Sequence, residues 1–201
     1  MRSLKRTKVL KANKNSITYG AKVLREGGLV AFPTETVYGL GANALKKKAL
    51  DNLYRAKARR RSKPFSILIS DFKIIKRMGC ALTAEAESVL DGFWPGPLTA
   101  ILKARSGKKI GFRMPDNRVA LELVKKSAVP VACPSANISG GPLPKDAREV
   151  TRQLYGRIDL ILDGGRTRIG VESTVVDFTV SPPKILREGA IKRKTIFKLI
   201  A

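Results

Sequence analysis

The sequence contains no histidine, and it has only two cysteines, Cys80 and Cys133, in 201 residues. The absence of histidine excludes Ser–His–Asp triads and the usual His/Cys zinc sites. Two cysteines are too few to form a disulfide framework. Any acid–base or metal chemistry must therefore use carboxylates, lysine, tyrosine, cysteine, the backbone or the substrate itself.

Long hydrophobic runs are also lacking. No apolar run approaches the ~18 residues of a membrane helix, and the N-terminus has no signal-peptide core. We therefore expect a cytoplasmic protein in a reducing compartment, with no membrane partner. A hydrophobic fraction of 43% in a chain of this length is typical of one globular domain.

Acidic residues are scarce, with 16 Asp and Glu against 40 Lys and Arg, and the net charge is +24. Such an excess attracts polyanions such as tRNA, rRNA, DNA or nucleotides, although it also suits a solvated surface with no dedicated partner. The densest basic segment is RAKARRRSK, residues 55–63, and residues 1–14 and the C-terminal tail are basic as well.

Apolar patterns typical of helices and strands interleave along the whole chain, which predicts the α/β class with one twisted sheet and flanking helices. We expect a single domain over residues 1–201. Its core would span about residues 14–190, between a basic N-terminal arm and a basic C-terminal tail.

The segment LVAFPTETVYGLG, residues 29–41, predicts a buried strand with a polar mouth. Its first four residues are apolar, and Pro33 ends the strand because it lacks an N–H donor. The polar residues 34–36 follow directly, and Gly39 and Gly41 allow a tight turn or the approach of a ligand. Ligands of open α/β sheets bind beyond the carboxyl ends of the strands, so this segment is a candidate pocket floor.

Further polar and cationic residues stand at predicted helix and strand ends: Lys57, Arg59, Arg113, Ser135, Asn137, Ser173 and Arg187. Each has a plain alternative, such as a solvated charge run, an Asx turn or β propensity. An arginine among apolar neighbours needs an anionic partner, which for Arg113 could be internal, Glu35 or Glu172. The shared placement of Thr34, Ser135, Ser173 and Arg187 at strand ends predicts a hydroxyl-rich, cationic pocket that binds an anion such as ATP.

Seven motifs occur in a specific order over roughly residues 16–190: FPTETVYGLGANA, Lys-x-Arg at 57–59, FWPGPLTAIL, FRMP, PVACPSAN, GVESTVVDF and ILREGAI. Together they resemble the threonylcarbamoyl-AMP synthase family, also called YrdC-like. The resemblance implies a twisted mixed sheet with a large, basic, concave pocket. It also implies a nucleotidyltransferase that converts L-threonine, bicarbonate and ATP, with Mg²⁺, into threonylcarbamoyl-AMP and pyrophosphate. The product would pass to a downstream threonylcarbamoyl transferase for tRNA modification.

Site residues follow from the same resemblance. It implies that Lys57 and Arg59 are catalytic, and that no residue of the chain is a metal ligand. The ATP-binding set is Lys57, Arg59, Lys63, Lys109, Ser135, Asn137 and Arg187. The threonine-binding set is Thr34, Thr36, Arg113, Cys133 through its backbone, and Ser173.

The chain departs from the usual family pattern at Arg60, Lys63, Leu68, Lys109 and Leu143. Relatives often have proline, asparagine, histidine, threonine and a hydroxyl residue, respectively, at these positions. The alternative interpretation is a double-stranded RNA-, tRNA- or ribosome-binding module of the same fold, YciO-like, without threonine activity. That module would depend on Arg60, Arg61 and the basic ends of the chain.

Overall fold

The computed structural model describes residues 6–200 of the chain. The predicted basic arm therefore lies partly outside the described residues. The strands are β1 (Lys8–Lys11), β2 (Val30–Phe32), β3 (Gly39–Asn43), β4 (Ile67–Leu68), β5 (Leu98–Lys103), β6 (Lys109–Arg113), β7 (Val131–Ala132), β8 (Leu160–Asp163), β9 (Thr174–Asp177) and β10 (Lys184–Arg187). The helices are α1 (Lys14–Glu26), α2 (Lys47–Ala56), α3 (Lys73–Arg77), α4 (Ala84–Phe93), α5 (Arg118–Ser127), α6 (Ala147–Leu154) and α7 (Arg193–Ile200).

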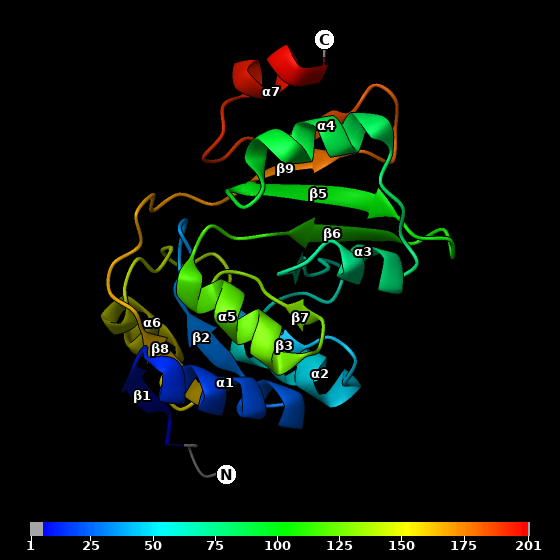
Figure 1. The fold of residues 1–201 in the computed structure, drawn as a ribbon. Helices are drawn as coiled ribbons and strands as arrows, with labels where there is room; N and C mark the ends of the chain where they lie inside the picture. Colours follow the sequence, from blue (N-terminus) through cyan, green and yellow to red (C-terminus); the bar gives the residue numbers. More distant parts are fainter. Residues whose placement is uncertain (1–5, 201) are drawn as a thin grey trace.

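The strands form one sheet in the order β1-β8-β2-β3-β7-β4-β6-β5-β9-β10. Pairing is parallel between β2 and β8 and between β5 and β9, but antiparallel between β2 and β3 and between β5 and β6. Figure 1 shows β5, β6 and β9 crossing the upper part of the molecule, while β2, β3 and β8 lie below them at a different angle. The predicted mixed, twisted sheet with flanking helices is confirmed.

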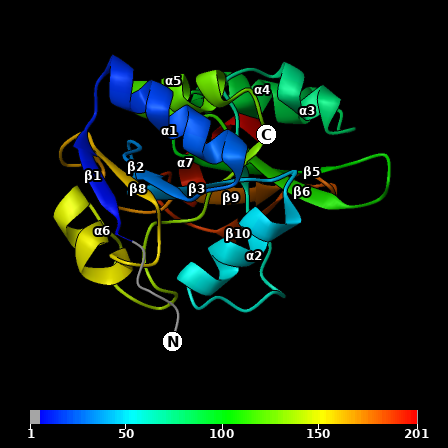
Figure 2. The same ribbon diagram turned by 90° about the horizontal axis from the view of Figure 1, so that it is seen from below.

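Strand β2 is buried on both faces, as its apolar run predicts. Val30 and Phe32 pack with Leu24 of α1 and Leu123 of α5, whereas Ala31 belongs to the core on the opposite face. Figure 2 shows α1 and α5 together on one side of these strands and α2 and α6 on the other. This double cover fixes the strand ends on which the site is built.

The glycines after β2 do not form the tight turn that the sequence suggested. Gly39 and Gly41 belong to β3, which pairs antiparallel with β2 and on its other edge with β7. A Cβ at Gly39 would lie 2.5 Å from the Sγ of Cys133, and one at Gly41 would lie 2.9 Å from the Cε1 of Phe32. Glycine is therefore required here for close packing of neighbouring side chains.

Helix α2 ends at Ala56. Ala58 adopts a positive φ of 48°, which a continuing right-handed helix does not permit. This break places Lys57 and Arg59 in an unwound segment. Elsewhere, no helix described within residues 6–200 is both long and apolar enough to cross a membrane.

Candidate functional site

The predicted site residues other than Lys109 line two adjoining hollows at the strand ends. The inner cavity, of about 130 Å³, is lined by Thr34, Thr36, Ser66, Leu68, Thr99, Arg113, Cys133 and Ser173, among others. The outer hollow, of about 590 Å³, is lined by Lys57, Arg59, Arg60, Lys63, Ser135, Asn137 and residues 139–141, among others. Arg59, Ser135 and Glu172 line both hollows. A small compartment therefore opens directly into a larger one.

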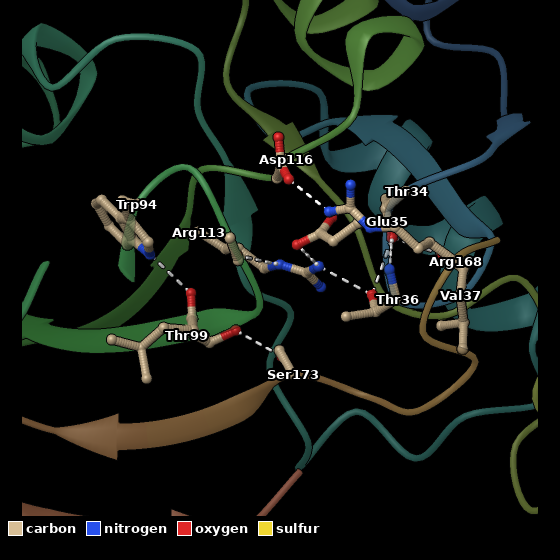
Figure 3. Close-up of polar contacts among 12 residues, drawn as sticks. Thr34, Glu35, Thr36, Val37, Trp94, Thr99, Arg113, Asp116, Arg168 and Ser173 are labelled. Carbon is tan, nitrogen blue, oxygen red and sulfur yellow. Dashed lines mark hydrogen bonds and ion pairs between the residues drawn. The ribbon is translucent and has the colours of Figure 1, made fainter. Parts of the chain in front are cut away.

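Arg113, at the end of β6, is the buried cation of the inner cavity. Its Nη2 lies 2.7 Å from Glu35 Oε1 and donates to Thr36 Oγ1 at 2.9 Å, while its Nε donates to the carbonyl of Gly96 at 3.3 Å. Figure 3 shows the guanidinium directed at Glu35 and Thr36. Glu35 is thus the internal partner of Arg113, one of the two that the sequence left open. These contacts fix the guanidinium plane before any ligand arrives.

Thr34 and Thr36 form a local hydrogen-bond chain. Thr34 Oγ1 donates to the carbonyl of Val37 at 2.7 Å and lies 2.9 Å from Thr36 Oγ1. Because a hydroxyl has a single proton, Thr36 must then donate to Thr34. Both protons are used within the protein. Thr34 Oγ1 also accepts from the Thr36 N–H at 3.2 Å, and Thr36 Oγ1 accepts from Arg113, so one lone pair of Thr36 Oγ1 is left for a ligand.

Ser173 precedes β9 and is held from two sides. Arg187, on β10, donates to the Ser173 carbonyl from Nε at 3.1 Å and from Nη2 at 2.9 Å, and Nη2 lies 3.3 Å from Ser173 Oγ. Arg187 also pairs with Glu172 at 2.8 Å. On the other side, Ser173 Oγ lies 2.8 Å from Thr99 Oγ1. The structure therefore brings together Ser173, from the predicted threonine-binding set, and Arg187, from the predicted ATP-binding set.

Cys133 lies against the inner cavity as predicted, but its backbone N–H is already used, since it donates to the carbonyl of Ser66 at 2.9 Å. Burial raises the pKa of its thiol to about 12. A thiol that stays protonated at neutral pH is a poor nucleophile. Cys133 therefore shapes the wall and has no nucleophilic role.

The surroundings of the Lys57 ammonium do not fit the prediction that it faces a phosphate. It is 1% exposed, and its ammonium donates to the carbonyls of Ser135 (2.5 Å) and Asn137 (2.7 Å) and to Asn137 Oδ1 (3.1 Å). All three ammonium protons therefore have protein acceptors. Burial, and next the charge of Arg59, lower the pKa of Lys57 from 10.5 to about 8. Lys57 holds the Ser135–Asn137 loop against the end of α2.

Arg59 is in the lining of both hollows, and backbone carbonyl groups hold its guanidinium. Nε donates to the carbonyl of Lys63 at 3.1 Å and Nη2 to that of Pro64 at 3.2 Å. The guanidinium carbon lies 5.2 Å from the centre of the Phe65 ring. The guanidinium is therefore oriented, yet it remains in the lining of both hollows.

Ser135 and Asn137 face the outer hollow through an ordered loop. Ser135 Oγ donates to Asn137 Oδ1 at 2.6 Å, and Asn137 Nδ2 donates to the carbonyl of Gly141 at 2.8 Å. The Asx-type turn considered from the sequence is not formed, because Asn137 Oδ1 accepts from Ser135 Oγ and from the ammonium of Lys57, while Ser139 N–H donates to the carbonyl of Lys57. The loop is built in advance of ligand binding.

Lys109 does not lie with the other predicted ATP-binding residues. It begins β6, at the end opposite Arg113, and pairs with Asp177 at 2.9 Å. Because a strand rises about 3.3 Å per residue, four residues separate Lys109 from the site by about 13 Å. Its predicted contact with ATP does not fit this placement. Lys63, in contrast, lines the outer hollow.

Two features were missed from the sequence. Thr99 lines the inner cavity, but a threonine within an apolar strand carries no signal beyond β propensity. The ion pair between Arg168 and Asp116, at 2.5 Å, lies beside Glu35 and Thr34 (Figure 3). Its partners are 52 residues apart, so no local pattern indicates it.

The donor set does not fit a metal ion held by the protein. Within residues 6–200, no group of three or more His, Cys, Asp or Glu side chains is arranged to hold a metal. Glu172 is the one carboxylate of the described chain that lines the two hollows, and Arg187 already pairs with it. The expected Mg²⁺ would therefore have to arrive on the phosphates of a nucleotide.

The fold and the cleft define the class of protein: an α/β protein whose strand ends present hydroxyl, amide and guanidinium groups to a cleft. Residues 22–189 match the Sua5/YciO/YrdC family model, which is described as "Telomere recombination". The chain belongs to this family, and the resemblance found in the sequence motifs is confirmed.

Known relatives agree with this assignment. The chain is 46% identical over 193 residues to the threonylcarbamoyl-AMP synthase of Pyrococcus abyssi, with 92% of this chain and 57% of the relative covered. It is 41% identical to the threonylcarbamoyl-AMP synthase of Bacillus subtilis, with 96% and 59% covered. The crystal structure of P. abyssi Sua5 complexed with L-threonine superimposes with a TM-score of 0.90 at 42% identity, covering 98% of this chain and 61% of that one. The chain thus spans less than two thirds of the length of these relatives.

Proposed function

We propose that this chain is an L-threonylcarbamoyladenylate synthase, a nucleotidyltransferase that uses L-threonine, bicarbonate and ATP. The observation that carries the proposal is the junction of the two hollows at Arg59, Ser135 and Glu172. A reaction that joins an amino acid to a nucleotide needs two adjoining compartments of unequal size. The names of the relatives and the threonine-bound neighbour support the same activity.

The inner cavity suits the amino acid. Arg113 offers a buried, oriented cation for its carboxylate, and Ser173 adds a hydroxyl. Thr36 Oγ1 has one acceptor lone pair to offer, which matches an ammonium or a hydroxyl of the substrate, and Thr34 orients Thr36 in the lining of the cavity. Leu68 adds an apolar wall next to these polar groups.

The outer hollow suits the triphosphate. Arg59 and Lys63 supply positive charge, and the loop that Lys57 holds presents Ser135 and Asn137 to the same space. The residues bind and orient, and no nucleophile–base pair is required. Mg²⁺ bound to the phosphates would offset their negative charge.

The chemistry balances without a protein nucleophile. The amine of threonine attacks the carbon of bicarbonate, a proton leaves the nitrogen, and loss of water gives the carbamate. A carbamate oxygen then attacks the α-phosphorus of ATP, and the bond to pyrophosphate breaks. Near-attack placement of the two substrates at the junction is the contribution of the protein. The product would serve a downstream transferase that modifies tRNA.

Pyrophosphate release in the presence of threonine, bicarbonate and ATP tests the activity. We expect Arg59→Ala, and separately the pair Ser135→Ala with Asn137→Ala, to lose turnover while the variants stay folded. Arg61→Ala is the matched control, since Arg61 is exposed, pairs with Asp51, and is not among the residues lining the two hollows. Unchanged pyrophosphate release by Arg59→Ala would refute the assignment of the site.

RNA binding by the native protein and by a second set of variants separates the enzyme from the RNA-binding alternative. If the native protein released no pyrophosphate but bound RNA with a steep salt dependence, the alternative would hold. Affinity for RNA would then fall in Arg60→Ala and Arg61→Ala and would be insensitive to Ser173→Ala.

A further inference from the structure

Thr99 is a buried residue with a hydroxyl group near the start of β5, a largely apolar strand. It is 3% exposed and follows Leu98 in β5, which pairs in parallel with β9. A buried hydroxyl costs free energy unless it is hydrogen-bonded. Its partner is Ser173 Oγ at 2.8 Å, and Ser173 is itself 5% exposed. Figure 3 shows the two hydroxyls facing each other.

The position of Ser173 next to Thr99 is fixed by the backbone. Thr174 donates its N–H to the carbonyl of Pro97 at 3.0 Å, and Leu98 is the register partner of Thr174. Arg187 holds the Ser173 carbonyl from the other side. The contact between the two hydroxyls therefore follows from strand register and does not depend on a flexible loop.

A count of protons shows what this contact does. The two hydroxyls carry two protons, and the bond between them uses one. Arg187 is only a donor, and its Nη2 lies 3.3 Å from Ser173 Oγ, so it occupies a Ser173 lone pair. If Thr99 donates to Ser173, the lone pairs of Ser173 are filled and its own proton is directed to another acceptor. Within residues 6–200 that acceptor is not a protein group, and both side chains line the inner cavity.

We propose that Thr99 is a positioning residue: it donates its proton to Ser173 Oγ, so that Ser173 presents its own proton to the carboxylate of the amino-acid substrate. This inference rests on the proposed function, since it takes threonine as the occupant of the inner cavity. Arg113 supplies the charge for the same carboxylate, and Thr99 makes Ser173 a donor. In Thr99→Val, Ser173 loses this partner and its hydroxyl is free to rotate.

The test is calorimetry of L-threonine binding to four variants. Thr99→Val removes the hydroxyl at nearly constant volume, and we expect about tenfold weaker threonine binding, the range of one hydrogen bond to a charged group. Thr99→Ser keeps the hydroxyl and should bind within about twofold of the native protein. Ser173→Ala should weaken binding, and adding Thr99→Val to it should cause no further loss.

Three further measurements distinguish positioning from a structural effect. L-threoninol, which lacks the carboxylate, should bind native protein and Thr99→Val equally. ATP binding in the absence of threonine and the thermal midpoint should also stay close to native values. If Thr99→Val does not fold, Thr99→Ala is measured against Thr99→Ser in its place.

The outcomes separate this proposal from the proposed function. Threonine binding by the native protein that Thr99→Val leaves unchanged would overturn the role of Thr99 alone. The role would also be overturned if Thr99→Val weakened threonine binding as much in the Ser173→Ala variant as in the native protein. Equal weakening of threoninol and threonine binding by Thr99→Val would overturn it as well. Absence of threonine binding by the native protein would overturn the proposed function and this inference with it.

Discussion

The ammonium of Lys57 lies 2.7 Å from the main-chain oxygen of Asn137 and 3.1 Å from its side-chain oxygen, so one buried cation ties the end of α2 to the loop after β7. The third ammonium proton goes to the carbonyl of Ser135. A lysine with three protein acceptors stabilises the loop that faces the outer hollow. We therefore expect any effect of Lys57 on a nucleotide in the outer hollow to be exerted through Ser135 and Asn137.

Replacement of Lys57 by methionine tests this connection. Lys57→Met leaves three buried oxygens without their donor, and we expect a loss of about 2 kcal/mol in the free energy of unfolding. ATP affinity should fall at least tenfold because the loop is no longer held. Lys48→Met, at an exposed position of the same helix, is the control and should change neither quantity. Native-like stability with weakened ATP binding would instead indicate direct contact with the phosphates.

The pH dependence of stability should also depend on Lys57. Burial lowers the pKa of this ammonium to about 8 from 10.5. Between these values the unfolded chain binds a proton that the folded chain has lost, so stability rises with pH. Relative to Lys57→Met, the native protein should gain about 1.4 kcal/mol per pH unit from pH 8 towards pH 10.5. Urea unfolding of both proteins measures this difference, and a constant or falling difference contradicts the prediction.

The buried pair of Arg113 and Glu35 should be sensitive to loss of either charge. Glu35→Ala leaves the guanidinium of Arg113 buried without its carboxylate, which typically costs about 3–5 kcal/mol of stability. Glu122→Ala is the control, because it breaks an exposed pair with Arg118 on one helix and should barely move the thermal midpoint. L-threonine should raise the midpoint of Glu35→Ala more than that of the native protein, since its carboxylate replaces the missing charge. Equal shifts would argue against a carboxylate site at Arg113.

The structure places Lys109 away from the other predicted ATP-binding residues, and this difference from the sequence prediction can be tested. Because it pairs with Asp177 at the far end of β6, we expect Lys109→Met to bind ATP within about twofold of the native protein. Lys63→Met, in the lining of the outer hollow, should weaken ATP binding more. Calorimetry with ATP compares the two. A larger loss in Lys109→Met would place the phosphates elsewhere than in the outer hollow.

The fold class and most of the site could be predicted from contiguous residues. The apolar run before Pro33, the polar residues 34–36 and the short motifs around Arg113, Ser135 and Ser173 each occupy a few neighbouring positions. Side-chain type and periodicity determine whether such a stretch is a strand end, and strand ends of an α/β sheet meet at one edge. Local sequence patterns therefore predict that these residues converge at one edge of the sheet.

The roles of individual residues depended on partners far away in the chain. Lys57 and Asn137 are 80 residues apart, and Thr99 and Ser173 are 74 apart. Strand order and register bring such pairs together, and a local sequence pattern predicts neither the order nor the register. The need for glycine at position 39 likewise comes from close packing against Cys133, a residue far away in the chain. The sequence therefore determined which chemical groups gather at the cleft, whereas only the tertiary structure decided which of them face a ligand and which hold the others in place.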